Sequence, residues 1–119
     1  MVFSGGESKI PECLSIASVV VSSNTKKPES FGLSMAEALM MGRPVVAKAF
    51  GGALDIVQDS VSGVLVRADA TDDVAAFADA IVKVHGSHFG DLRKDACRRF
   101  DAAVMAARTR TVYDEVLHA

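Results

Sequence analysis

Two glutamates, Glu29 and Glu37, lie eight positions apart in the segment KPESFGLSMAEAL, with a glycine between them. Gly32 permits a tight backbone turn, and the residues after it have the composition of a helix that begins near Leu33. The first amide groups of such a helix have no partner within it, which favours a phosphate, and Leu33 and Ser34 would supply them. Carboxylates accept hydrogen bonds and repel anions, so the two glutamates suit hydroxyl groups. This order of acceptor, donors and acceptor matches a nucleotide sugar, in which a diphosphate joins two sugars.

Alternating strands and helices would position this turn. Short valine-rich segments predict strands at residues 2–4, 18–22, 44–47 and 64–66, and helices are predicted at 10–17, 33–41, 53–58 and 71–84. Apolar strands joined by helices predict an α/β fold with a short parallel sheet and right-handed crossovers. Residues 1–119 are interpreted as one domain, with an α/β core at 1–84 and a helical tail at 85–119.

The tail is charged and free of proline after Gly90. One predicted helix carries an apolar stripe that includes Leu92, Ala96 and Phe100. Four basic residues are expected opposite that stripe: Arg93, Lys94, Arg98 and Arg99. Acidic residues are interleaved with them, so this surface is interpreted as a solvated face, with a membrane or anion patch as the alternative.

Composition narrows the function classes. The formal net charge of −2 gives no electrostatic case for nucleic acid. The longest apolar run is too short to cross a bilayer, and the first residues do not form a secretory signal. Cys13 and Cys97 have no neighbouring ligand pair and are interpreted as reduced, packed thiols. The sequence therefore predicts a cytoplasmic protein without a metal site, and no cofactor is expected.

The segment around the two glutamates resembles the E-x7-E signature of retaining glycosyltransferases with the GT-B fold, of the group 1 or family 4 type. The similarity extends to ASVVVSSN before it and to GRPVVAKAFGGALDIVQDSVSGVLV after it, and covers roughly residues 2–84. This resemblance implies a partial Rossmann-like, three-layer sandwich from the C-terminal, donor-binding domain of such an enzyme.

The resemblance also implies roles for the segment. Glu29 would be the catalytic residue that contacts the donor sugar and stabilises its charge, and Glu37 would bind the ribose hydroxyls. Donor binding by backbone amides is implied for Phe31, Gly32, Leu33 and Ser34. The alternatives are a solvated loop carboxylate for Glu29, an exposed helix residue for Glu37 and a core side chain for Phe31.

Three further candidates follow the next predicted strand. Gly51 and Gly52 open a loop at the edge where α/β sheets bind ligands, and a purely structural turn explains them equally well. Lys48 could meet a phosphate, although a solvated loop lysine is the simpler interpretation. Asp55 stands where the family usually has a glutamate.

Two hypotheses of function follow. The first is a fragment of a glycosyltransferase that binds the nucleotide-sugar donor and, in the complete enzyme, transfers the sugar with retention to an acceptor. The second is a non-catalytic nucleotide-binding or assembly module, and related epimerases are a third option. By resemblance, the N-terminal acceptor domain and the first strands of this domain are absent. The isolated chain is therefore expected to be inactive, and homo-oligomers are expected through an exposed sheet edge at residues 19–21.

Overall fold

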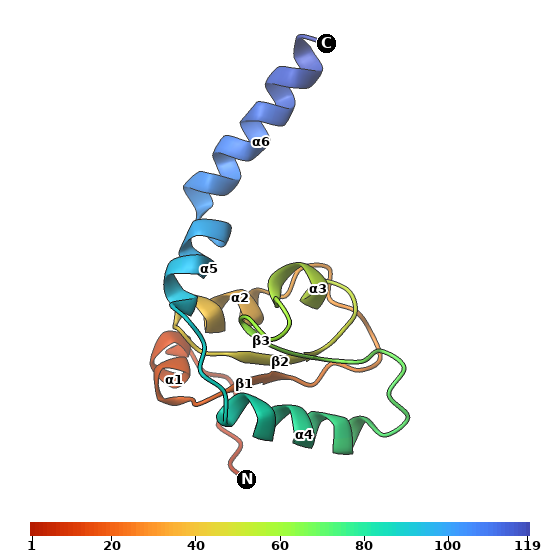
Figure 1. The fold of residues 1–119 in the computed structure, drawn as a ribbon. Coiled ribbons are helices and arrows are strands. Elements are labelled where there is room, and N and C mark those ends of the chain that lie inside the picture. The colour runs from red at the N-terminus through yellow and green to blue at the C-terminus, as the bar shows by residue number, and fades with distance from the viewer.

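Helices and strands alternate along the first two thirds of the chain, and two helices follow them (Figure 1). The computed structural model describes residues 1–119. In chain order the elements are α1 (Ile10–Ile16), β1 (Val20–Ser22), α2 (Leu33–Met40), β2 (Val45–Lys48), α3 (Ala53–Ile56), β3 (Gly63–Val66), α4 (Asp73–His85), α5 (Leu92–Phe100) and α6 (Ala102–Leu117).

The three strands form one parallel sheet in the order β1-β2-β3. Val45 of β2 pairs with Val20 on one side and with Gly63 on the other. Every residue of β2 is buried, as expected for the central strand of a covered parallel sheet. A Cβ atom at Gly63 would lie 1.9 Å from the carbonyl oxygen of Val45, so only glycine lets these two strands approach.

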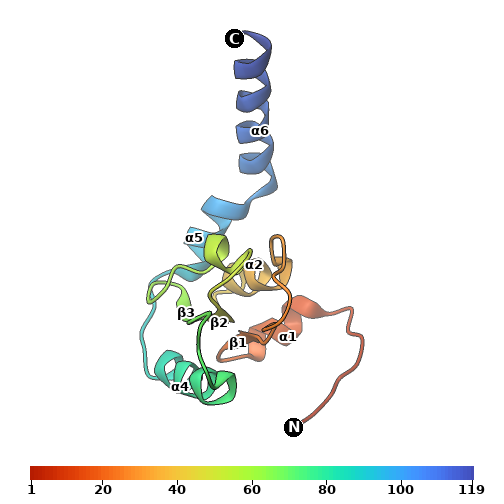
Figure 2. The same cartoon turned by 90° about the vertical axis from the view of Figure 1, so that its right-hand side faces the viewer.

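Helices cover both faces of the sheet (Figures 1 and 2). On one face, residues of α2, α3 and α5 pack with Val45 and Ala47 in a core cluster. On the other face, Phe77, Ala80 and Val84 of α4 pack against Val46 and β3. The predicted three-layer, partial Rossmann-like α/β sandwich is therefore confirmed.

One predicted strand is wrong. Residues 2–4 lie in an irregular, exposed N-terminal segment, in which Val2 is 92% and Phe3 is 88% exposed. A short apolar run becomes a strand only when a neighbouring strand accepts its backbone hydrogen bonds. No strand of the sheet pairs with this segment, so the sheet has three strands instead of the four expected.

The two helices of the tail differ in their packing. Ala96 of α5 is 1% exposed and belongs to the core cluster beside α2, whereas α6 has no buried residue. Figures 1 and 2 show α6 projecting away from the body of the molecule. The side chain of Asp101 accepts hydrogen bonds from the first amides of α6 and so caps it. No helix combines the length and the hydropathy that a membrane span needs.

Candidate functional site

Two loops meet at the carboxyl edge of the sheet, because β1 and β2 are parallel neighbours. The Glu29 loop (residues 23–32) joins β1 to α2, and the glycine loop (residues 49–52) joins β2 to α3. The amide of Gly52 donates a hydrogen bond to the carbonyl oxygen of Glu29 at 2.8 Å. A Cβ atom at Gly52 would lie 1.9 Å from the carbonyl oxygen of Phe31, and Gly51 has a φ of +57°. Both glycines are thus needed for the close contact between the loops.

The turn predicted before α2 is present. Gly32 has a left-handed backbone, with a φ of 102°, and its carbonyl oxygen accepts from Met35 and Ala36 at 3.1 and 3.3 Å. The amides of Leu33 and Ser34 have no acceptor in the chain, as expected for the first turn of a helix. Leu33 is 68% exposed, so its side chain adds little to the packing of the core.

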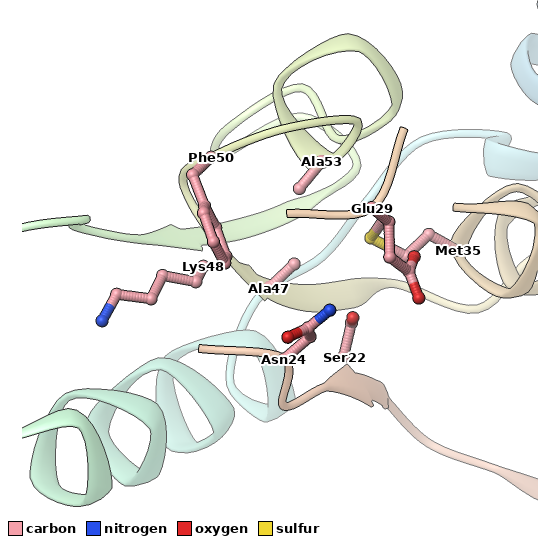
Figure 3. A pocket seen from close by; sticks show the side chains of 8 residues that line it. All are labelled: Ser22, Asn24, Glu29, Met35, Ala47, Lys48, Phe50 and Ala53. Carbon is pink, nitrogen blue, oxygen red and sulfur yellow. The ribbon is translucent and has the colours of Figure 1, made fainter. Parts of the chain in front are cut away.

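Glu29 lies beside this turn. A Cβ atom at Gly32 would be only 2.9 Å from Glu29 Oε2, so the carboxylate folds over the glycine. Residues 29–34 together line an open hollow of about 450 Å³. Glu29 also lines a smaller recess with Ser22, the last residue of β1, and with Asn24 in the loop after it (Figure 3). The recess and the hollow place a carboxylate, polar side chains and free amides at one edge of the sheet.

Glu37 lies outside this hollow. The residue is exposed on α2 and lines a separate groove of about 190 Å³ between α1 and α2. The other lining residues are almost entirely apolar: Ile10, Pro11, Leu14, Met40 and Met41. The structure therefore brings Glu29 and residues 31–34 together, and puts Glu37 farther along α2 beside an apolar surface.

Lys48 does not lie in a solvated loop, which corrects the simpler interpretation from the sequence. It is the last residue of β2 and is 8% exposed. Its ammonium donates to both carboxylate oxygens of Asp73, the first residue of α4, at 2.7 and 2.9 Å. Lys48 lines the same recess as Glu29, although Figure 3 shows its side chain pointing away from Glu29. A buried ammonium requires such a partner, so Lys48 joins the sheet to α4.

Phe31 is not a core residue, but its ring has an aromatic partner. Its ring is 41% exposed and meets the ring of Phe100 edge to face, with 6.0 Å between centroids and 82° between planes. Such an aromatic pair contributes about 0.5–1.5 kcal/mol beyond the area it buries. The end of α5 thus contacts the Glu29 loop directly, although the two are far apart in sequence.

Arg99 is the second residue that joins α5 to the site. Its Nη2 donates to the carbonyl oxygens of Asp55 and Ile56 at 2.8 and 3.0 Å, which caps the C-terminal end of α3. Its guanidinium also lies 4.6 Å from the centroid of the Phe100 ring, a cation–π contact. The side chain is 17% exposed, so the prediction that placed Arg99 on a solvated face is wrong.

Charges on α5 stabilise this arrangement. Hydrogen bonding from Arg98, and then from Arg99, holds the pKa of Asp95 below its ordinary value of 3.8. Asp95 accepts from Arg98 at 2.8 Å and from Arg99 at 3.3 Å, within one turn of helix. The carboxylate therefore stays ionised and orients the Arg99 fork toward α3.

Sequence reasoning missed Ser22, Asn24, Arg99 and Phe100. The first two carry a usable signal, because polar residues at the carboxyl end of a valine-rich strand and just after it fall at the ligand-binding edge of a parallel sheet. The last two carry none, since Arg99 meets carbonyl groups 43 and 44 positions earlier in the chain.

Comparison with known proteins shows the family of the chain. Residues 1–87 match the family of group 1 glycosyl transferases. A D-inositol 3-phosphate glycosyltransferase of Xylanimonas cellulosilytica is 42% identical over 87 residues, which are 73% of this chain and 19% of that protein. A phosphatidyl-myo-inositol mannosyltransferase of Mycobacterium leprae is 36% identical over 93 residues, 74% of this chain and 24% of that protein.

The chain thus spans a quarter or less of the length of these relatives. A further D-inositol 3-phosphate glycosyltransferase, from Kribbella flavida, is 48% identical over 56 residues, which are 47% of this chain and 12% of that protein. No solved structure matches the chain. The family match covers most of the chain and includes both loops of the site, so this chain belongs to the group 1 glycosyl transferases.

Proposed function

We propose that this chain is the donor-binding part of a retaining glycosyltransferase and that its ligand is a nucleoside diphosphate sugar. One observation carries the proposal: the left-handed turn at Gly32 leaves the amides of Leu33 and Ser34 without acceptors, between two carboxylates. Amides at the N-terminus of a helix favour a phosphate through their unpaired N–H groups and the helix dipole.

The surroundings of the turn suit the rest of such a ligand. The hollow beside Glu29 would take the donor sugar, whose hydroxyls the carboxylate can accept. On the other side of the turn, Glu37 borders the apolar groove of Ile10, Pro11 and Met40. The Glu37 carboxylate can accept hydrogen bonds from the ribose hydroxyls, and the apolar surface beside it can contact the attached base.

Titration of the ¹⁵N-labelled chain with uridine diphosphate and with guanosine diphosphate tests the proposal. We expect the amide signals of Gly32, Leu33, Ser34 and Glu37 to move together. Binding should be weak, with a dissociation constant on the order of 1 mM, because few groups contact the phosphates. Shifts concentrated on residues 93–99 would instead show nonspecific attraction of an anion to α5.

Three variants sharpen this test. Gly32→Ala should abolish the shifts, because the φ of +102° is a backbone conformation that alanine rarely adopts and the turn would be distorted. Leu33→Ala should bind as the wild type does, since its exposed side chain can change while its amide remains. Glu37→Gln should weaken binding of the nucleotide but not of inorganic phosphate. Equal binding by all three variants would contradict the proposed site.

The transfer step itself needs a placed acceptor and neutralised phosphates. We therefore expect purified chain to release no nucleoside diphosphate from nucleotide sugars above the buffer background. Measurable turnover by the chain alone would contradict that assignment. We propose a cytoplasmic location, as predicted from the sequence. Cys13 and Cys97 are both free thiols, but Cys13 is exposed, so the prediction that it is a packed thiol is wrong.

We also propose that copies of this chain associate through the outer edge of β1. This strand pairs only with β2, and Val21 is 39% exposed. Unpaired strand edges bind further strands, and the exposed Val2 and Phe3 of a second copy have suitable side chains. Light scattering at high micromolar concentration should give a mass above that of a monomer, and Val21→Lys should lower it. A monomeric wild type would exclude this assembly.

A further inference from the structure

We propose that Phe100 and Arg99, at the end of α5, are positioning residues for the turn at Gly32. The inference rests on the proposed function, in which that turn binds the diphosphate of the donor. Neither side chain lines the hollow or the recess at the site, so both would act through the residues they hold.

Phe100 restrains the residue that directly precedes the turn. Phe31 is half-exposed, and the edge-to-face contact with Phe100 is its aromatic contact in the structure. The carbonyl group of Phe31 lies against Gly52, so the orientation of this residue sets the contact between the two loops. If Phe31 lost its contact with Phe100, the residue next to the left-handed Gly32 would no longer be held in place by α5.

Arg99 restrains the opposite side of the same contact. α3 has four residues and begins directly after Gly52, whose amide holds the carbonyl oxygen of Glu29. So short a helix is not stable alone, and Nη2 of Arg99 donates to two carbonyl groups at its end while Nη1 donates to Asp95. The cation–π contact between Arg99 and Phe100 joins the two restraints. α5 therefore fixes both loops from outside the site.

Amide hydrogen exchange in the ligand-free chain tests this inference directly. The reporters are the amides of Gly52 and Met35, which are buried and donate to Glu29 and Gly32. In Phe100→Leu we expect both to exchange roughly 2- to 12-fold faster, the factor that corresponds to loss of one aromatic pair. Phe100→Tyr keeps the ring and should restore the wild-type rates. Arg99→Lys should speed the exchange of Gly52, because a single ammonium replaces the two nitrogens that contact α3 and Asp95 separately.

Phe89→Leu is the matched control, because Phe89 packs in the cluster on the α4 face and should leave both reporters unchanged. Titration with uridine diphosphate follows, and binding by Phe100→Leu should weaken by a similar factor while Phe89→Leu binds as the wild type does. Equal reporter exchange in Phe100→Leu and Phe89→Leu would overturn the inference, whether or not the nucleotide binds. Wild-type chain that binds no nucleotide would contradict the proposed function, and the exchange rates would still decide the positioning role.

Discussion

Gly52→Ala tests the contact between the two loops in isolation. Gly52 has a φ of −59° and a ψ of −20°, which alanine adopts without strain, so the new methyl group is the only perturbation. That methyl would meet the oxygen, carbonyl carbon and Cα of Phe31 at 1.9, 2.4 and 2.7 Å, and backbone atoms cannot rotate away. Overpacking costs about 1–3 kcal/mol, and the displaced hydrogen bond to Glu29 adds about 0.5–1.5 kcal/mol. We expect the free energy of unfolding to fall by about 1.5–4.5 kcal/mol.

Equilibrium unfolding in urea measures this loss. With a typical dependence of about 2 kcal/mol per M, the midpoint should fall by about 1–2 M. Gly86→Ala is the matched control, because its backbone is right-handed and a Cβ there meets only ordinary contacts at 3.7 and 3.9 Å. That variant should differ from wild type by less than about 1 kcal/mol. A Gly52→Ala midpoint as close to wild type as that of Gly86→Ala would refute the close approach of the loops.

The remaining predictions concern charge. In a complete enzyme that contains this domain, Glu29→Ala and Glu37→Ala should each lower the rate of sugar transfer by orders of magnitude. The melting temperature should stay within a few degrees of wild type, because exposed carboxylates add little stability. A large fall of the melting temperature in both variants would indicate a structural role. Asp73→Ala should destabilise the chain in urea, because it leaves the Lys48 ammonium buried without a partner, but by less than the loss of about 3–5 kcal/mol for a fully buried pair, since the Asp73 side chain is 34% exposed. The double variant Lys48→Met/Asp73→Ala should regain much of the lost stability. If Asp73→Ala alone unfolds at the same urea midpoint as wild type, the Lys48–Asp73 pair does not contribute to stability. The pKa of Asp95 is lowered in the folded chain, so its contribution is present above its ordinary value of 3.8 and is lost as the pH falls through the lowered pKa. The unfolding free energies of wild type and Asp95→Asn should therefore converge below about pH 4, and a constant difference down to pH 2 would contradict the assignment.

The strands of the sheet and the turn before α2 are largely predictable from the sequence. The long-range contacts that hold them in place are not. β2 and the α2 turn were predictable because a buried parallel strand is continuously apolar, and because a glycine before a helix has a local meaning. Residues 2–4 have the same composition as a strand, yet strand formation depends on a neighbour that local composition does not reveal. Lys48 and Arg99 were placed in solvent because their partners, Asp73 and the carbonyls of α3, lie 25 or more positions away. Whether a charged side chain is exposed to solvent or joins two elements of the fold depends on partners that are distant in the sequence.

The exposure of α6 has a consequence for the energetics of any contact it makes. None of its 16 residues is buried, so its helicity depends on local propensity and on the Asp101 cap. An isolated helix of this length is only marginally stable in water. In solution this segment is then expected to exchange between helix and coil. A surface that binds the helix would select the helical population. The affinity for such a surface is reduced in proportion to the helical fraction of the free chain. Replacing Asp101 would therefore change the strength of a contact made through Tyr113 or Leu117, more than ten residues away, without touching that contact.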